Sequence, residues 1–413
     1  MTQFLYTGGR VLFPGASALE EGTDLLVEGD RIKEVGPRLS SGLAARIDLE
    51  GRTLMAGLVD AHVHVVASGV NVAENAALPS SLTALRAARI MNGMLMRGFT
   101  TVRDVGGADH GLKRAVEEGL IDGPRLVISG KALGQTGGHT DFRPRSDNRG
   151  TFDERLGALG RLADGVDAVR RAARDEIRAG ADLIKIMANG GVASPNDPIH
   201  ALGYSRDEIR AAVEEAQNAG TYVSAHLYTD EAIRRAVECG VHSLEHCNLI
   251  QPETARLAAA RGCIACPTLV AYEGLALEGA ALGLGPDSVA KIETVRRGGM
   301  ESLTIMREAG LPMAYGSDLL GPLHKYQSME FAIRARVLPA HEVLASASVI
   351  AARLCHLEGQ VGSLAPGAYA DLIVVDGDPL TEIGLLDGQG ARIPVIMKGG
   401  RFYKNDLHRS DFA

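Results

Sequence analysis

Two histidines separated by one residue, His62 and His64, follow the apolar residues 57–61 and give the clearest indication of metal chemistry in this chain. Side chains at positions i and i+2 of a strand project from the same face, so both imidazoles can reach one metal ion. The pair alone is equally compatible with two half-exposed or hydrogen-bonded strand histidines. A metal site therefore requires further ligands from elsewhere in the chain.

Further candidate ligands stand at the ends of other strand-like runs. Lys185, His226 and His246 each lie at the end of an apolar run, and Asp318 follows residues 312–316. Each has a simpler explanation, because a strand-end histidine is often core or surface, a lysine can pair with an acid and an aspartate can cap a helix. Their joint placement favours a metal site, since barrel enzymes carry their chemistry at this end of the strands.

Strand-like runs alternate with amphipathic helical stretches through the middle of the chain. Helices are expected at residues 166–179, 205–219 and 229–239, with Ser205 and Thr229 as caps. This alternation predicts an α/β fold, specifically a (β/α)8 TIM-like barrel. A doubly wound open sheet is the alternative, although no G-x-G-x-x-G motif follows the first strand. The strand-like runs end at His64, Asp104, Gly130, Met187, His226, His246, Pro267 and Gly316.

The candidate ligands, taken together, resemble a known superfamily. Their order along the chain is similar to that of the amidohydrolase superfamily, and the likeness extends over nearly the whole sequence. The finer likeness is to prolidase-like and imidazolonepropionase-related members, which include Xaa-Pro dipeptidases, zinc carboxypeptidases and ochratoxin-hydrolysing amidases. The superfamily likeness is carried by His62-x-His64, Lys185, His226, His246 and Gly316-Ser317-Asp318, and the finer likeness by residues 97–104, 135–139 and 185–195.

The two ends of the chain have a different texture, with short strand-like runs separated by Gly- and Asp-containing turns. This texture and the resemblance together predict a small accessory β-sandwich built from both ends. The predicted domains are residues 1–56 as one accessory half, 57–358 as the metal-dependent barrel and 359–413 as the other half. The expected strands are residues 4–6, 24–28, 31–35 and 45–49, then 370–376 and 393–403.

The resemblance implies two divalent metal ions, with zinc expected and Mn, Co or Fe as substitutes. Two neighbouring cations need a bridging anion, and an ammonium group has the wrong sign. Relatives with a lysine at this position carbamylate it with CO2, so the resemblance implies a CO2-derived carbamate on Lys185. One ion would be held by His62, His64, Lys185 and Asp318, and the other by Lys185, His226 and His246.

The resemblance further implies hydrolysis of an amide bond by a metal-bridging hydroxide. Asp318 is the expected catalytic residue, which takes the proton of the hydroxide and passes it to the leaving amine. A role for Asp318 as a ligand alone is the alternative. The expected substrates are dipeptides or N-acyl amino acids, as for a carboxypeptidase or prolidase, with ochratoxin A among them. Cyclic amides, lactones and deamination substrates are the alternatives among enzymes, and a metal-binding barrel without catalysis is the alternative of another class.

Substrate contacts are expected from segments over the site. His139 lies in the long segment 132–165, and the counterparts of His139 and Tyr228 contact substrate in related dipeptidases. Simpler roles are bracing of the loop by His139 and packing by Tyr228. A second loop is expected at residues 268–286. Candidates for binding an anionic group are Arg143 and Arg145, and candidates for supporting hydrogen bonds are Asp60, Asp104 and Glu245.

The composition is that of a folded enzyme acting on small molecules. The chain has 413 residues, 46% of them hydrophobic and 23% charged, which is enough for a large core. A net charge of −8 without a Lys/Arg-rich block argues against a nucleic-acid partner, and no apolar stretch reaches membrane-spanning length. The N-terminal residues lack a leader pattern, so a cytoplasmic protein is expected, and exposed helices suggest a homo-oligomer. The C-x-x-C pair, Cys263 and Cys266, is expected to be reduced and packed.

Overall fold

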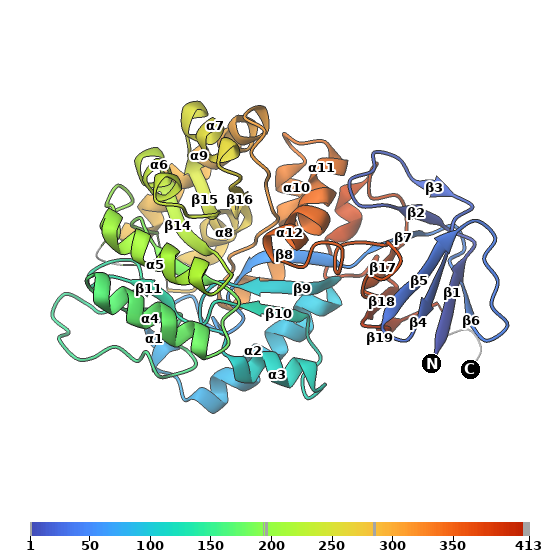
Figure 1. Cartoon of the computed structure of the whole chain (residues 1–413), viewed down its shortest axis with the longest axis horizontal. Helices are drawn as coiled ribbons and strands as arrows, with labels where there is room; N and C mark the ends of the chain where they lie inside the picture. The colour runs from blue at the N-terminus through green and yellow to red at the C-terminus, as the bar shows by residue number, and fades with distance from the viewer. Residues whose placement is uncertain (1, 193, 195–196, 284–285, 408–413) are drawn as a thin grey trace.

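The computed structural model describes residues 2–192, 194, 197–283 and 286–407. It contains a larger α/β body and, at one end of this body, two smaller β-sheets near both chain ends (Figure 1). The larger body carries the residues that the sequence marks for chemistry.

Parallel strands form the centre of the larger body. One sheet pairs β8 (Leu58–Val63) with β9 (Phe99–Asp104), and β9 with β10 (Arg125–Ile128). All pairings in these two sheets are parallel, which requires a crossover connection between successive strands. The second sheet has the order β12 (Gly160–Leu162), β11 (Ala132–Gly134), β13 (Ile184–Met187), β14 (Val223–Thr229), β15 (Ser243–Leu249) and β16 (Ile264–Cys266).

The segment that leads to Asp318 lies between β16 and β8. On one side, the amide of Ala265 in β16 donates to the carbonyl of Pro312 at 2.9 Å. On the other side, the amide of Ala61 in β8 donates to the carbonyl of Tyr315 at 2.7 Å. This irregular segment stands where the sequence predicted the last strand of the alternation, and it delivers Asp318 to the end of β8.

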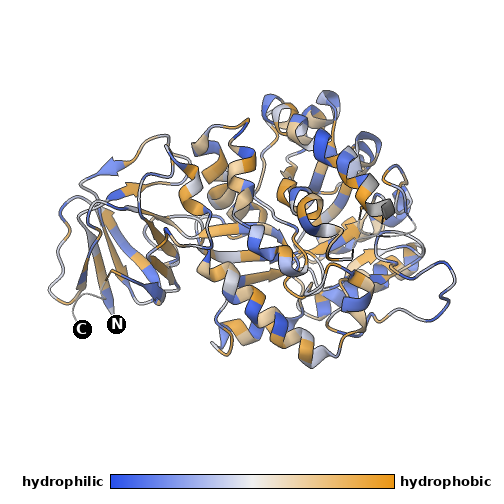
Figure 2. Cartoon of the chain, turned by 180° about the vertical axis from the view of Figure 1, so that it is seen from behind, coloured by the Kyte–Doolittle hydropathy of each residue, from blue (hydrophilic) through white to orange (hydrophobic). Residues whose placement is uncertain are grey.

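Helices surround the parallel strands and bury their apolar sides against them. Hydrophobic and hydrophilic residues alternate along these helices (Figure 2). Ser205 and Glu208 form a capping box at the start of α5, and the Thr229 side chain caps α6, so both predicted caps are confirmed. None of the helices in the described part of the chain is long and apolar enough to cross a membrane. The longer helices are α2 (Ser80–Met96), α3 (His110–Glu117), α4 (Val166–Arg178), α5 (Arg206–Asn218), α6 (Asp230–Glu238), α7 (Pro252–Ala260) and α9 (Pro286–Glu308).

Shorter helical turns fill the connections. The short α-helices are α1 (Val72–Ala77), α8 (Leu269–Gly274), α10 (Met329–Arg334), α11 (Ala340–Ala345) and α12 (Ala351–Leu354). The π-helix η1 (Leu275–Gly279) continues α8. The others are η2 (Gly321–Tyr326), η3 (Ser346–Ile350) and η4 (Ile383–Leu386).

The two smaller sheets combine residues from both ends of the chain. Strand β17 pairs antiparallel with β7, so residues before β8 pair with residues after α12. A common cluster of buried side chains, including Tyr6, Leu25, Leu54 and Leu372, contacts both sheets. One sheet has the order β5 (Arg31–Gly36), β4 (Asp24–Glu28), β1 (Gln3–Thr7) and β6 (Ala45–Asp48). The other has the order β19 (Arg401–Asn405), β18 (Val395–Lys398), β17 (Leu372–Val375), β7 (Thr53–Ala56), β2 (Arg10–Leu12) and β3 (Glu20–Glu21).

Some expected boundaries are wrong for local reasons. The segment 132–165 is not loop throughout, because it begins with β11 and ends with β12, which are too short to show a periodic pattern. The segment 268–286 contains α8 and η1. The run 393–403 is two strands, since Gly399 and Gly400 turn the chain with positive φ angles of 56° and 72°.

Candidate active site

A cavity of about 70 Å³ opens at the carboxyl ends of the parallel strands. The structure brings together there every residue predicted as a metal ligand, as the catalytic group or as a substrate contact. Apolar residues complete the wall, among them Val72, Phe142, Leu159 and Leu320. The predicted residues that line it are His62, His64, His139, Lys185, His226, Tyr228, His246 and Asp318.

The carboxylate of Asp318 lies among three imidazoles. Its Oδ1 is 3.2 Å from Nε2 of His64 and 3.4 Å from Nε2 of His62, and its Oδ2 is 3.9 Å from Nδ1 of His246. Burial acts to raise the pKa of Asp318, but the histidines outweigh it and hold this pKa well below its ordinary value. Asp318 is therefore a carboxylate at neutral pH.

Two residues of the site have a strained backbone. Asp318 has a φ of 50° and His246 a φ of 70°, both in the left-handed region that few non-glycine residues adopt. Such conformations cost about 1–3 kcal/mol each and occur most often at functional sites. Close packing adds to the constraint at Gly316, where a Cβ would lie 2.6 Å from the Cys266 sulfur and 2.9 Å from the His62 Cβ.

Hydrogen bonds fix which ring nitrogen each histidine presents to the cavity. Nδ1 of His62 contacts Glu245 at 2.7 Å, and Nδ1 of His64 donates to the carbonyl of Gly106 at 2.9 Å. The Nε2 atoms of both rings are left facing Asp318, where a bound metal ion would take their lone pairs.

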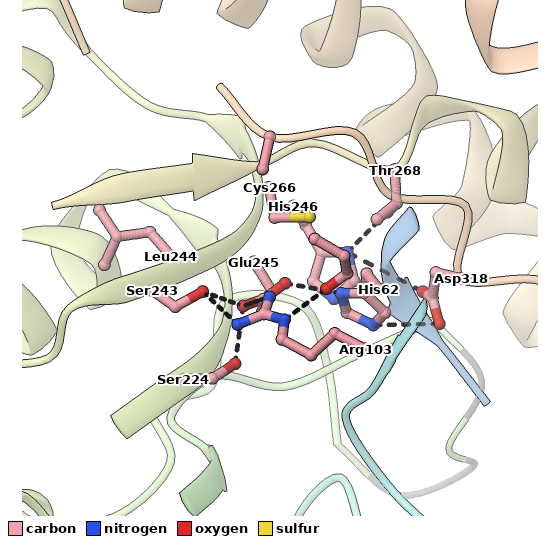
Figure 3. Close-up of polar contacts among 12 residues, drawn as sticks. His62, Arg103, Ser224, Ser243, Leu244, Glu245, His246, Cys266, Thr268 and Asp318 are labelled. Atoms are coloured by element: carbon pink, nitrogen blue, oxygen red, sulfur yellow. Dashed lines mark hydrogen bonds and ion pairs between the residues drawn. The ribbon is translucent and has the colours of Figure 1, made fainter. Parts of the chain in front are cut away.

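Glu245 lies at the centre of a buried polar network beneath these rings (Figure 3). Its carboxylate accepts from Arg103 at 2.8 Å and from the Ser224 hydroxyl at 2.6 Å. Burial acts to raise the pKa of Glu245, but Arg103 and then His62 hold it well below its ordinary value. Glu245 is thus an anion whose carboxylate oxygens are taken up by hydrogen bonds. It orients His62 and does not itself bind a metal ion.

Two other acids play similar supporting parts. Asp60 accepts from the Ser317 hydroxyl at 2.6 Å, and Asp104 accepts from the Val65 amide at 2.7 Å. Both carboxylates hold the segments that carry the candidate ligands. The supporting hydrogen bonds predicted for Asp60, Asp104 and Glu245 are confirmed.

The amine of Lys185 is buried in the same cavity. Within the described residues, Nζ of Lys185 has no hydrogen-bond partner, which is costly for a buried donor. Burial lowers the pKa of Lys185 to about 8. The nitrogen is therefore neutral in a larger fraction of molecules than in a solvated lysine.

The donor set fits divalent metal ions. Ligand atoms of His62, His246 and Asp318 lie within 4.8 Å of one another. Burial, first of all, lowers the pKa of His226 and of His246 well below the ordinary value, so both rings are neutral and offer lone pairs. The cavity thus combines a carboxylate and neutral imidazoles, which are ligands for divalent metal ions, with an unpaired buried amine.

A second cluster with metal-like spacing joins His62, Glu245 and Cys266. The hydrogen bonds of Glu245 account for this cluster, and burial raises the pKa of the Cys266 thiol well above its ordinary value. A neutral thiol is a poor metal ligand. All five cysteines of the chain are free and buried, which confirms the prediction for Cys263 and Cys266.

His139 stands over the ring of His226, with 4.2 Å between the ring centroids. Its Nδ1 lies 2.7 Å from the Ser194 hydroxyl and 3.3 Å from the Asp197 carboxylate. A Cβ at Gly191 would overlap the His139 ring, so only glycine fits there. These contacts hold His139 with one ring nitrogen engaged by Asp197 and the other available to a ligand.

Tyr228 and Tyr272 form another part of the cavity wall. The Tyr272 hydroxyl donates to the Tyr228 hydroxyl at 3.2 Å, and the Tyr228 ring centroid is 5.2 Å from that of His246. The Tyr228 amide donates to Oδ1 of Asn189 at 2.8 Å, which fixes the end of β14. Sequence reasoning did not identify Tyr272, because it lies on α8 in a segment expected to be loop.

The two loop arginines do not line this cavity. Arg143 forms an ion pair with Asp141 at 2.7 Å and lines a neighbouring cavity instead. Arg145 is exposed.

Imidazole, carboxylate and amine groups gathered at the carboxyl ends of parallel strands define an enzyme site of the β/α class. Residues 53–401 match the Amidohydrolase family, and the chain belongs to this family. It is a hydrolytic enzyme, and the superfamily resemblance seen in the sequence is confirmed.

Known proteins similar to this chain include an ochratoxinase, a prolidase and a Xaa-Pro dipeptidase. Ochratoxinase from Aspergillus niger is 30% identical over 364 residues, which cover 85% of this chain and 75% of that protein. The prolidase in a crystal structure with N-methylphosphonate-L-proline is 50% identical to this chain, with a TM-score of 0.96. The match covers 98% of this chain and 100% of the prolidase chain. A Xaa-Pro dipeptidase structure with methionine bound in the active site is 27% identical, with a TM-score of 0.86 and coverage of 98% and 100%.

Proposed function

We propose that this protein is a binuclear metal-dependent hydrolase that cleaves the amide bond of dipeptides or N-acyl amino acids. The observation that carries the proposal is the position of the Asp318 carboxylate, between His62 and His64 in the cavity that also holds the buried amine of Lys185. The similarity to prolidase, Xaa-Pro dipeptidase and ochratoxinase supports an amide as the bond that is cleaved.

The proposed architecture is a closed (β/α)8 barrel over residues 57–358, with an accessory β-sandwich from residues 1–56 and 359–413. The backbone hydrogen bonds of the segment before Asp318 to both β16 and β8 support closure. The pairing of β17 with β7 and the common buried cluster support the sandwich.

The proposed ligands divide into two sets that share Lys185. His62, His64 and Asp318 would hold one ion and His226 and His246 the other, with zinc as the expected metal. The neutral Lys185 amine would attack CO2, so that an N–C bond forms and a proton leaves, and the resulting carbamate would serve both ions. When bound, divalent ions at such a site lower the pKa of water and polarise a carbonyl oxygen.

The other steps are assigned to the chain's own groups. Asp318 accepts a proton from the attacking water as its oxygen bonds to the carbonyl carbon, and gives this proton to the leaving nitrogen as the C–N bond breaks. His139 and Tyr228 donate hydrogen bonds to the substrate's carbonyl or terminal carboxylate. The engaged Nδ1 of His139 and the hydroxyl contact of Tyr228 with Tyr272 support these positions. A homo-oligomer and a cytoplasmic location stay predictions.

A substrate screen tests the proposal. The zinc-reconstituted protein, with bicarbonate present, is assayed against dipeptides such as Ala-Pro, N-acyl amino acids, ochratoxin A, cyclic amides and lactones, beside Asp318→Asn. We expect turnover of at least one amide and its loss in the variant. Turnover confined to cyclic amides or lactones would move the assignment to those substrates. Bound metal without turnover of any of them would overturn the proposed substrates.

A further inference from the structure

A second cavity, of about 280 Å³, adjoins the candidate active site. Both cavities are lined by Val72, Thr140, Phe142 and Leu159. Because these residues border both spaces, the two cavities are neighbours, and the second cavity lies within reach of a molecule held at the active site. The second cavity is also the larger of the two, so it can take up a bulky part of such a molecule.

The wall of the second cavity is mainly apolar. Ala73 and Ala76 of α1 form one side, and Phe142, Phe152 and Leu159 from the connection between β11 and β12 form much of the other. In Figure 1, α1 and this connection lie at the end of the molecule away from the two smaller sheets. An apolar group that enters this space leaves water and gains contact with aromatic and aliphatic side chains.

The charged groups at this cavity disfavour a carboxylate there. Arg143 faces Asp141 at 2.7 Å, and Arg149 faces Asp147 at 2.7 Å, so each guanidinium is already neutralised by its own acid. Glu74 adds a further negative charge to the wall. A substrate carboxylate would meet repulsion and lose hydration, whereas an uncharged group would not.

Tyr228, one of the two expected substrate contacts, lines the active-site cavity but not the second cavity. Tyr228 stacks near His246, with 5.2 Å between ring centroids. Leu159 lies on the His64 side, because its carbonyl packs against Gly106, whose own carbonyl accepts from His64. A substrate with its amide between His64 and His246 thus has its carboxylate toward Tyr228 and its acyl group toward Leu159.

We propose that the second cavity is a subsite for a large apolar acyl group. This subsite rests on the proposed function and specifies its substrates. The preferred substrates are N-acyl amino acids whose acyl group is long or aromatic. Small acyl groups such as acetyl would leave the subsite empty and gain nothing from it.

The test is a substrate series at constant leaving group. N-acetyl-, N-hexanoyl-, N-decanoyl- and N-(2-naphthoyl)-L-phenylalanine are compared with the zinc-reconstituted wild type, Ala76→Trp and the matched control Leu85→Trp. Leu85 is 69% exposed on the neighbouring helix α2, outside both cavities. We expect kcat/KM to rise at least about tenfold from acetyl to decanoyl or naphthoyl in the wild type. Leu85→Trp should keep this rise, and Ala76→Trp should lose it while still hydrolysing the acetyl substrate.

The other possible results would overturn the subsite alone or the subsite together with the proposed function. Equal kcat/KM across the series in an active wild type would overturn the subsite but leave the proposed function intact, as would a rise that survives in a folded Ala76→Trp. If Ala76→Trp does not fold, by circular dichroism, Ala73→Leu takes its place with the same expectation. No turnover of any member, nor of the dipeptides, would overturn the proposed function and the subsite together.

Discussion

Glu245 contacts Nδ1 of His62 at 2.7 Å through one carboxylate oxygen, while Arg103 binds its other oxygen at 2.8 Å. Both acid and guanidinium are fully buried. The contact leaves Nε2 of His62 directed at Asp318, so the geometry of the candidate metal site depends on a residue that is not itself a ligand.

Glu245→Gln should therefore weaken metal binding. We expect zinc affinity to fall about 10- to 100-fold, because His62 loses a charged partner that fixes its tautomer and raises its basicity. Competition with a chromophoric chelator measures this affinity. Glu293→Gln, in an exposed ion pair with Arg297, is the control and should bind zinc as the wild type does. Equal affinity in Glu245→Gln would show that this contact does not support the site.

The same substitution should also destabilise the fold. Loss of the carboxylate leaves Arg103 charged and buried, and breaking a buried ion pair costs about 3–5 kcal/mol. Denaturant unfolding of the metal-free proteins measures this cost apart from metal binding. A loss below about 1 kcal/mol, the value of a surface ion pair, would argue that Arg103 finds another acceptor.

Asp197→Asn tests the position of His139. The amide cannot hold the imidazole as the carboxylate does, and a hydrogen bond to a charged group contributes about 1.5–3 kcal/mol, so kcat/KM for the best amide substrate should fall about tenfold or more. Zinc content should not change, since Asp197 contacts no proposed ligand other than through His139. Asp207→Asn on the exposed side of α5 serves as the control. A loss of zinc in Asp197→Asn would instead assign this acid to the metal site.

Carbamylation of Lys185 should depend on pH. The reactive form is the neutral amine, and the pKa of Lys185 is lowered to about 8 by burial, so the neutral fraction rises as the pH increases through 8. Under a fixed partial pressure of 13CO2, the metal-free protein should show a stronger carbamate carbon signal by NMR at pH 9 than at pH 6.5. Lys185→Met should lack the signal, and an equal signal in that variant would place the carbamate elsewhere.

Much of this molecule could be predicted from its sequence, because the informative residues stand in regular elements. His62, Lys185 and His226 lie within or at the end of parallel strands, and parallel strands present their carboxyl ends to one side. Periodicity and capping residues likewise located α4, α5 and α6 within one or two residues.

The features of the site that the sequence does not predict depend on contacts between distant segments. Asp197 reaches His139 across the connection after β13, and Tyr272 reaches Tyr228 from a helix that the sequence presents as a loop. The second cavity arises from α1 and residues 140–160, which have no common motif. Local pattern carries no information on such pairs, since they are set by how loops pack on the strands.

A zinc titration of the metal-free protein tests the central claim most directly. Hydrolysis of Ala-Pro, or of the best substrate from the screen, is followed with bicarbonate present as zinc is added. We predict that activity develops as two zinc ions bind per chain, by elemental analysis of the desalted protein. Lys185→Met should bind less zinc and show no turnover at any zinc concentration. Hydrolysis at the full rate by the chelator-treated protein, without bound metal, would contradict a metal-dependent hydrolase.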